Sequence, residues 1–190
     1  MRTIFAFDTA TSVATCSLVC DGSPSDEVRT EARLILRAAD ELFRAAGIGP
    51  NDLDGVVVGT GPGSFTGVRI GLATARGLAL GVGVPVAGVS TLHAYTGGQP
   101  VIDARRGEVF AEGPTVARPE ELDVAGSTLV GDGAVRYRDV FEAAGANIPP
   151  DGDPAHLPAS HLLVPFAEEF GPAEEVEPIY LRTPDAKPSR

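Results

Sequence analysis

The chain has 190 residues and a formal net charge of −11, from 15 basic and 26 acidic side chains. This acid excess argues against capture of nucleic acid by the chain's own charge, because such binding begins with Lys and Arg clusters on the phosphates. A hydrophobic share of 43% excludes a wholly disordered chain, and no apolar run reaches the roughly 20 residues that span a bilayer. We therefore expect a globular cytoplasmic protein with no membrane contact and two reduced cysteines, Cys16 and Cys20.

The first hundred residues predict alternating strands and helices. Residues 3–8 and 13–20 have the composition of two hairpin strands, with Asp8 at the rim. Residues 28–46 have helical spacing, and Gly47 suits the end of that helix. The following elements are predicted in this order: strand 56–59, glycine-rich loop 59–67, helix 68–81, strand 84–89 and a brief helix capped by Ser90 and Thr91.

A second unit is predicted to begin near Pro100, so we expect two domains, residues 1–99 and residues 100–190. Residues 101–103 and 108–111 flank a four-residue hairpin loop. Further predicted elements are a strand at 128–131, an amphipathic helix at 137–144 and a docking strand or turn at 178–182.

The glycine-rich loop from Gly59 to Gly67 does not fit three familiar site motifs. It lacks the lysine of a phosphate-binding Walker A loop, the glycine spacing of a dinucleotide fingerprint and the glycines around a nucleophilic serine. Two interpretations remain, tight backbone packing and an anion site at the start of the next helix. For the second, the candidate anion or nucleotide contacts are Asp8, Thr9, Thr11, Gly61, Gly63 and Ser64.

Small residues recur every four positions along the helix after this loop, in one stripe from Gly67 to Ala79 and a second comprising Ala73, Gly77 and Gly81. Glycine inside a helix costs up to about 1 kcal/mol, so its repetition favours close contact with another backbone. That backbone is either the protein's own sheet or a helix of another chain. For the second case, the candidate interface residues are Leu34, Ile35, Ala38, Leu42, Gly67, Arg69, Gly71, Ala75, Arg76 and Ala79.

Catalytic and metal sites have weak support in the sequence. The three histidines, His93, His156 and His161, lack the spacing of a zinc pair, so we expect no metal site and assign no catalytic residue. Asp8 is either a turn cap or a lone catalytic or metal-contacting acid. Residues 103–108 hold charges of both signs, which suit a hairpin ion-pair set better than a site.

Four ordered blocks resemble the bacterial TsaB (YeaZ) family. They are residues 4–11 (IFAFDTAT), 61–71 (GPGSFTGVRIG), 102–109 (IDARRGEV) and 177–182 (EPIYLR), with Ala75, residues 77–79 and residues 89–92 extending the second block. The resemblance implies an α/β, actin-like and sugar-kinase-like (ASKHA, ribonuclease H-like) fold of two lobes. In this chain the second lobe is expected to be shortened, because little strand-like sequence follows Phe110.

The resemblance also implies a function in tRNA modification. Members pair, through helices of the first lobe, with the paralogue TsaD, which carries the metal and transfers threonylcarbamoyl to the adenosine 3′ of the anticodon in tRNAs reading codons that begin with A. The ATPase TsaE joins the pair. This chain is then a non-catalytic scaffold and activator that meets tRNA only through the complex. We expect it to bind no cofactor tightly by itself, and the resemblance allows ATP or ADP with Mg²⁺ at the partner complex.

The residues by themselves are also compatible with two other functions. One is an ATP-dependent phosphotransferase of the same fold that uses Asp8 as a base or metal contact. The other is a homodimeric binding module that uses the small-residue helix. This chain also departs from the family pattern at the start of its first helix, where residues 30–33 read TEAR.

Overall fold

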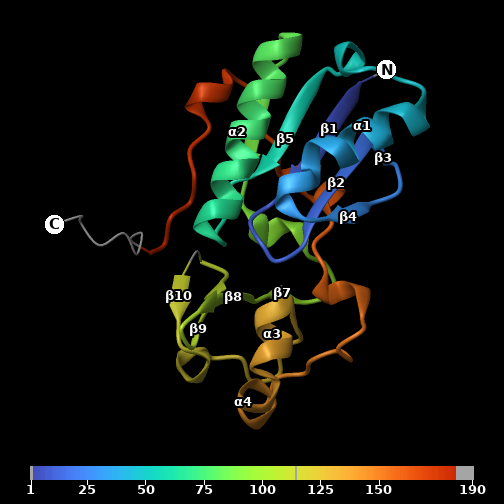
Figure 1. Ribbon diagram of the computed structural model, residues 1–190. Helices are drawn as coiled ribbons and strands as arrows, with labels where there is room; N and C mark the ends of the chain where they lie inside the picture. The colour runs from blue at the N-terminus through green and yellow to red at the C-terminus, as the bar shows by residue number, and fades with distance from the viewer. Residues whose placement is uncertain (1, 114, 183–190) are drawn as a thin grey trace, which may run out of the picture.

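A computed structural model of the chain describes residues 2–113 and 115–182, whose elements fall into a larger and a smaller group (Figure 1). The larger group holds a six-stranded sheet with the order β3-β2-β1-β5-β6, and β4 also pairs with β2. β1 is antiparallel to β2 and parallel to β5, which is parallel to β6. The strands are β1 (Thr3–Asp8), β2 (Ala14–Cys20), β3 (Ser23–Pro24), β4 (Val28–Thr30), β5 (Gly55–Gly59) and β6 (Val86–Val89).

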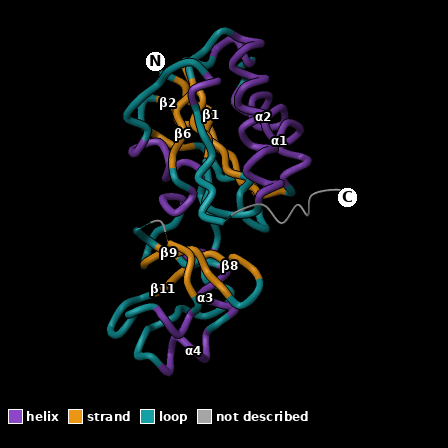
Figure 2. Tube along the Cα trace, turned by 90° about the vertical axis from the view of Figure 1, so that its left-hand side faces the viewer, coloured by secondary structure: helices purple, strands orange, loops and turns teal. Residues whose placement is uncertain are grey.

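Two helices, α1 (Ile35–Ala46) and α2 (Phe65–Val82), cover one face of this sheet (Figures 1 and 2). Phe5 and Phe7 point to these helices, whereas Ile4 and Ala6 belong to the core on the opposite face. Alternate residues of a strand point to opposite faces, so a sheet covered on both sides requires apolar residues throughout. The central strands β1 and β5 are buried along their whole length.

The helix predicted over residues 28–46 was wrong in its first part. Val28–Thr30 forms β4, which pairs with β2, and the helix proper begins only at Ile35 after a 3-10 turn at Ala32–Leu34. The β-branched residues of β4 suit a strand, and pairing with β2 outweighs the helical spacing. The end of the helix was predicted correctly, since Gly47 adopts φ 69° there.

The smaller group follows β6 and has its own apolar core. Val101, Val109, Leu129 and Phe141 are each no more than 2% exposed within it. The predicted hairpin is confirmed, with β8 and β9 antiparallel to each other. The elements are β7 (Gln99–Pro100), β8 (Ile102–Arg105), β9 (Glu108–Ala111), β10 (Thr115–Ala117), β11 (Leu129–Val130), α3 (Asp132–Arg136) and α4 (Arg138–Ala143).

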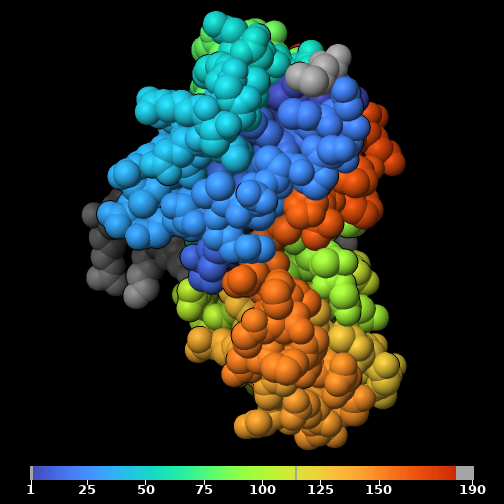
Figure 3. Space-filling view, turned by 90° about the vertical axis from the view of Figure 1, so that its right-hand side faces the viewer, coloured from blue at the N-terminus to red at the C-terminus, as the bar shows by residue number. Residues whose placement is uncertain are grey.

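The C-terminal residues return to the larger group, although one second domain was predicted for residues 100–190. Ser160 Oγ lies 2.8 Å from Ser17 Oγ of β2. The amide of Ile179 donates to the carbonyl of Thr60 at 2.8 Å. Figure 3 shows an orange-red stretch of the chain lying against the blue N-terminal part. We call residues 171–182 the strap; residues 183–190 of the predicted second unit lie outside the described part of the chain.

Candidate functional site

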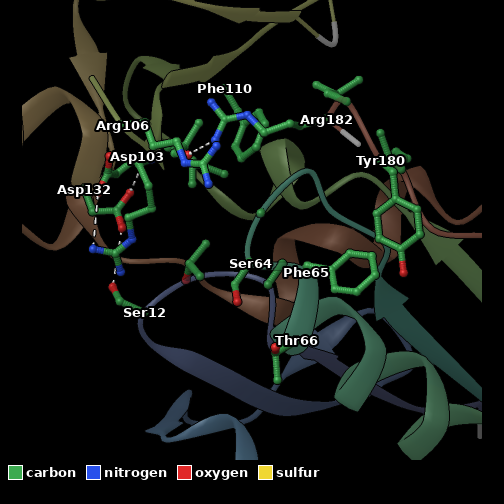
Figure 4. Close-up of a pocket in the computed structure, with 18 residues that line it drawn as sticks. Ser12, Ser64, Phe65, Thr66, Asp103, Arg106, Phe110, Asp132, Tyr180 and Arg182 are labelled. Carbon is green, nitrogen blue, oxygen red and sulfur yellow. Dashed lines mark hydrogen bonds and ion pairs between the residues drawn. The ribbon is translucent and has the colours of Figure 1, made fainter. Parts of the chain in front are cut away.

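A cavity of about 360 Å³ lies where the two groups of elements meet. One wall is the turn at 10–12 with residues 63–66, which lead into α2, and the opposite wall is the β8–β9 hairpin with Asp132 of α3. Residues 179–182 of the strap line the third side (Figure 4). Three of the six candidate contacts line this cavity, namely Thr11, Gly63 and Ser64.

Asp8 lies behind the cavity wall and has no exposed area. Its carboxylate accepts hydrogen bonds from Thr91 Oγ1 at 2.6 Å and from the amide of Ala10 at 2.7 Å. Burial raises the pKa of Asp8, and these two hydrogen bonds oppose that rise. Asp8 does end β1 at the rim of the hairpin, opposite Thr15, but β5 covers its carboxylate at Gly59, where a Cβ would lie 1.6 Å from Asp8 Oδ2.

Thr9 and Gly61, two more of the candidate contacts, are also buried and do not line the cavity. The Thr9 hydroxyl donates to the carbonyl of Gly67 at 2.8 Å, which ties the turn after β1 to the first turn of α2. The amide of Gly61 donates to Thr91 Oγ1 at 3.0 Å. Both polar groups are satisfied within the protein.

The glycine loop packs against the turn after β1. A Cβ on Gly63 would lie 2.3 Å from the carbonyl oxygen of Ala10, which itself accepts from the amide of Ser64 at 2.6 Å. The hydroxyl of Ser64 caps α2 by accepting from the amide of Gly67 at 3.3 Å. Of the two interpretations of this loop, tight packing accounts for Gly63 and Gly67 directly.

Two carboxylates stand on the opposite wall. Asp132 accepts from the amide of Asp103 at 3.0 Å and from the Ser12 hydroxyl at 3.4 Å, and burial followed by the charge of Asp103 raises its pKa. Asp103 Oδ2 lies 3.5 Å from Arg105 Nη1, which agrees with the ion pairs predicted for this hairpin, and 3.6 Å from Arg136 Nη1. Asp132 was not predicted from the sequence. The flanking glycines Gly131 and Gly133, whose backbone packs closely on Val101 and Ile102, were the signal that could have indicated it.

Cations and aromatic rings complete the cavity. Arg182 donates to the carbonyl of Ala104 at 2.9 Å and forms an ion pair with Glu108. The rings of Phe65 and Tyr180 lie 4.9 Å apart, and Arg106 and Phe110 are seen on the hairpin side in Figure 4. A cavity with cations, hydrogen-bonded carboxylates and aromatic faces has the polar and apolar groups that hold a small polar ligand.

Most of the residues predicted for the partner interface are buried inside the chain, as the alternative of packing against the protein's own sheet requires. Gly67, Gly71, Ala75 and Ala79 face the sheet, and a Cβ on Gly71 would lie 2.5 Å from Thr9 Oγ1. On α1, Ile35, Ala38 and Leu42 join the same core. The second stripe, Ala73, Gly77 and Gly81, is exposed instead.

Three predicted interface residues remain exposed, Leu34, Arg69 and Arg76. Arg69 lies over the ring of Phe65 and donates to the Tyr180 hydroxyl at 3.3 Å. Arg76 donates to the carbonyls of Ala173 and Val176 at 3.2 and 3.0 Å. Both arginines thus hold the strap.

Within residues 2–113 and 115–182, no three His, Cys, Asp or Glu side chains are grouped so that they could hold a metal ion. His156 is buried and its Nδ1 accepts from the amide of Gly131 at 3.2 Å. Cys16 and Cys20 are both free thiols. Among the helices in those same residues, none combines the length and apolar character that a membrane crossing requires.

Comparisons with known proteins find relatives that cover nearly the whole chain. Residues 23–142 match the family described as TsaD, tRNA N6-adenosine threonylcarbamoyltransferase. The tRNA threonylcarbamoyladenosine biosynthesis protein TsaB of Escherichia coli (strain K12) is 33% identical, with 94% of each chain covered. An uncharacterised protein of Mycobacterium tuberculosis (strain H37Rv) is 35% identical over 99% of this chain and 95% of its own. The solved structure of YeaZ from Pseudomonas aeruginosa superposes with a TM-score of 0.80 at 27% identity, covering 95% of this chain and 100% of that one.

Together the sheet, its two helices and these relatives define an actin-like, ribonuclease H-like α/β fold. More narrowly, the chain belongs to the TsaB (YeaZ) family, as the four sequence blocks predicted.

Proposed function

We propose that this chain acts in the synthesis of threonylcarbamoyladenosine in tRNA, as a non-catalytic scaffold that pairs with and activates a TsaD-like protein. The supporting observation is the 33% identity to E. coli TsaB across 94% of both chains. A TsaE-like ATPase joins the pair, and the complex modifies the adenosine 3′ of the anticodon in tRNAs that read codons beginning with A. The acidic chain meets tRNA through its partners, in the cytoplasm.

The state of Asp8 supports a role without catalysis by this chain alone. A phosphotransferase that used Asp8 would need its carboxylate open to substrate or metal, yet both oxygens are engaged and none of the side chain is exposed. Tight nucleotide binding is accordingly assigned to the partner complex, where ATP or ADP and Mg²⁺ enter.

The exposed face of α2 is the surface we propose for the partner. A Cβ added at Gly77 or at Gly81 would have no atom within 4 Å, and Leu80 is 89% exposed between them. Small residues on an open helix face allow a second helix to approach closely, and a large exposed apolar side chain gains most from being covered. Leu34 and Leu36 continue this surface: the turn holding Leu34 contacts α2, and Leu36 is 54% exposed.

We further propose that the two groups of elements are the two lobes of an ASKHA fold, the second one shortened. Each group has an apolar cluster of its own, which supports this assignment, and a third cluster, which contains Ile4 of β1 and Ile102 of β8, joins the two groups. The cavity would then be the interlobe cleft of that fold.

The test uses the purified chain and the TsaD-like protein of the same organism. Size-exclusion chromatography should show a complex, and tRNA incubated with both, substrate and the ATPase should gain threonylcarbamoyladenosine, as measured by mass spectrometry of its nucleosides. The chain alone should give none. Robust modification without TsaD would overturn the scaffold role.

A matched pair of variants tests the surface. Gly77→Leu fills the exposed stripe and should weaken the complex by roughly tenfold or more through overpacking. Ala143→Leu, on the exposed end of α4, should leave it unchanged. An unaltered complex with Gly77→Leu would exclude this face. Loss of a homodimer by the same variant, with no TsaD complex in the wild type, would favour the homodimeric module.

A further inference from the structure

The strap runs beside α2 from the edge of the sheet to the cavity, as the red segment in Figure 1 shows. At its start, Gly171 exchanges two backbone hydrogen bonds with Val86 of β6, at 2.9 and 3.0 Å. Near its end, the amide of Ile179 donates to Thr60 at 2.8 Å. Between these points the strap has few backbone partners, so side chains must hold it in place.

Those side chains are the two arginines of α2. Arg76 reaches the carbonyls of Ala173 and Val176, and Arg69 reaches the hydroxyl of Tyr180 while lying 3.8 Å from the centre of the Phe65 ring. Hydrogen bonds from a charged donor are among the stronger ones in proteins. The position of the strap is therefore set by α2.

The far end of the strap crosses to the other wall of the cavity. Arg182 donates to the carbonyl of Ala104 and pairs with Glu108, so one side chain holds both strands of the β8–β9 hairpin. Ile179, Tyr180 and Leu181 line the cavity on the way. A continuous series of contacts thus joins α2, the strap and the hairpin.

We propose that the strap is a latch through which occupation of the exposed face of α2 closes the cavity between the two groups of elements. The proposal rests on the proposed function in one respect, that this face receives a protein partner. At 100° per residue, Arg69 and Arg76 border the exposed stripe on the side of Leu80 and Ala73. A partner there removes water from both guanidinium groups, which strengthens their hydrogen bonds to the strap. Arg182 then holds the hairpin against α2.

The first test uses the isolated chain and hydrogen exchange measured by mass spectrometry. In Arg76→Ala, amides of residues 171–181 should exchange roughly tenfold faster, and those of the hairpin at 102–111 should follow in the same direction. Amides of β1 should not change, because the latch opens without global unfolding. Arg37→Ala, which removes an exposed pair with Glu41 on α1, is the matched control and should change nothing.

Arg182→Ala cuts only the last contact, so the hairpin should exchange faster while the amide of Gly171 keeps its protection. This variant also carries the test if Arg76→Ala does not fold. A hairpin whose exchange is unchanged in Arg182→Ala would overturn the latch.

The second test adds the TsaD-like protein to wild type and to Arg182→Ala. Both should form the complex in size-exclusion chromatography, but only the wild-type hairpin should exchange more slowly on binding. If the complex forms but hydrogen exchange in the wild-type hairpin does not slow, the latch is contradicted and the proposed function is not. Absence of any complex contradicts the proposed function, whereas the result on the isolated chain still decides whether strap and hairpin are joined.

Discussion

Thr91 Oγ1 donates a hydrogen bond to the carboxylate of Asp8 at 2.6 Å, and the same oxygen accepts the amide of Gly61 at 3.0 Å. One hydroxyl therefore joins the end of β1, the glycine loop and the segment after β6, and all three residues are buried. This junction lies behind the cavity wall that residues 10–12 and 63–66 form.

Replacing Thr91 by Val should destabilise the protein by about 2–4 kcal/mol, because two buried polar groups lose their partner and each costs about 1–3 kcal/mol. Unfolding in urea, followed by circular dichroism, measures the loss. Thr91→Ser keeps the hydroxyl and should stay within about 1 kcal/mol of wild type. Equal losses in the two variants would show that the methyl group, and not the hydrogen bonds, matters at this position.

Gly71 lies on the buried face of α2 and Gly77 on the exposed face, so replacing each by alanine should change stability with opposite signs. A Cβ on Gly71 would meet Thr9 Oγ1 at 2.5 Å, so Gly71→Ala should cost about 1–3 kcal/mol. A Cβ on Gly77 meets nothing within 4 Å. There the better helix propensity of alanine should raise stability by about 0.5–1 kcal/mol. Thermal melts of both variants provide the comparison, and a loss at Gly77 would contradict an open face at this position.

Glu27 joins the C-terminal segment to the sheet and should make stability depend on pH. Burial raises its pKa, but hydrogen bonds from Ser160, Thr15 and His161 outweigh that effect and lower the pKa below its ordinary value of 4.5. A carboxylate with a lowered pKa stabilises the fold above pH 4.5, and this contribution disappears as the pH falls through the folded-state pKa.

Glu27→Gln should therefore cost about 2 kcal/mol at pH 7, and the difference from wild type should shrink as the pH falls below 4.5. Urea unfolding at a series of pH values checks both statements. Glu41→Gln, at an exposed pair with Arg37, is the control and should change stability by at most about 0.5 kcal/mol. A difference that grows at low pH would contradict a lowered pKa of Glu27 in the folded protein.

The two cysteines of β2 should differ sharply in reactivity. Burial, and then the charge of Glu27, raises the pKa of Cys16 to about 12, and its side chain has no exposed area. Cys20 is half-buried at the end of the strand. An aromatic disulfide reagent at pH 8 should label one thiol in the native protein and two in urea. Cys20→Ser should abolish the native signal, and labelling of Cys16 in that variant would show that β2 opens.

The local order of elements was predictable where the signal is short-range. The hairpin of β1 and β2, the cap at Gly47 and the β8–β9 hairpin follow from turn residues and apolar runs within a few positions. The start of α1 was not predictable, because β4 pairs with a strand more than ten positions earlier in the chain. The spacing of apolar residues along a segment carries no information about a strand partner elsewhere in the chain.

The candidate site was predicted only in part, for the same reason. Thr11, Gly63 and Ser64 do line the cavity, but Asp132, Arg182 and Tyr180 reach it from distant elements. The repeat of small residues on α2 was visible in the sequence, yet it occurs twice and spacing cannot say which stripe is buried. The close approach of Thr9 decides that it is the stripe of Gly67 and Gly71.

The sequence by itself determined the family, the α/β character and the acidic charge of −11, because motifs, composition and local patterns are properties of the chain. Only the tertiary structure decided that Asp8 is enclosed, that Ala73, Gly77 and Gly81 face outward, and that the strap returns to α2. Burial and long-range hydrogen bonds depend on which surfaces meet, and that is settled when the whole sheet, its helices and the strap pack together.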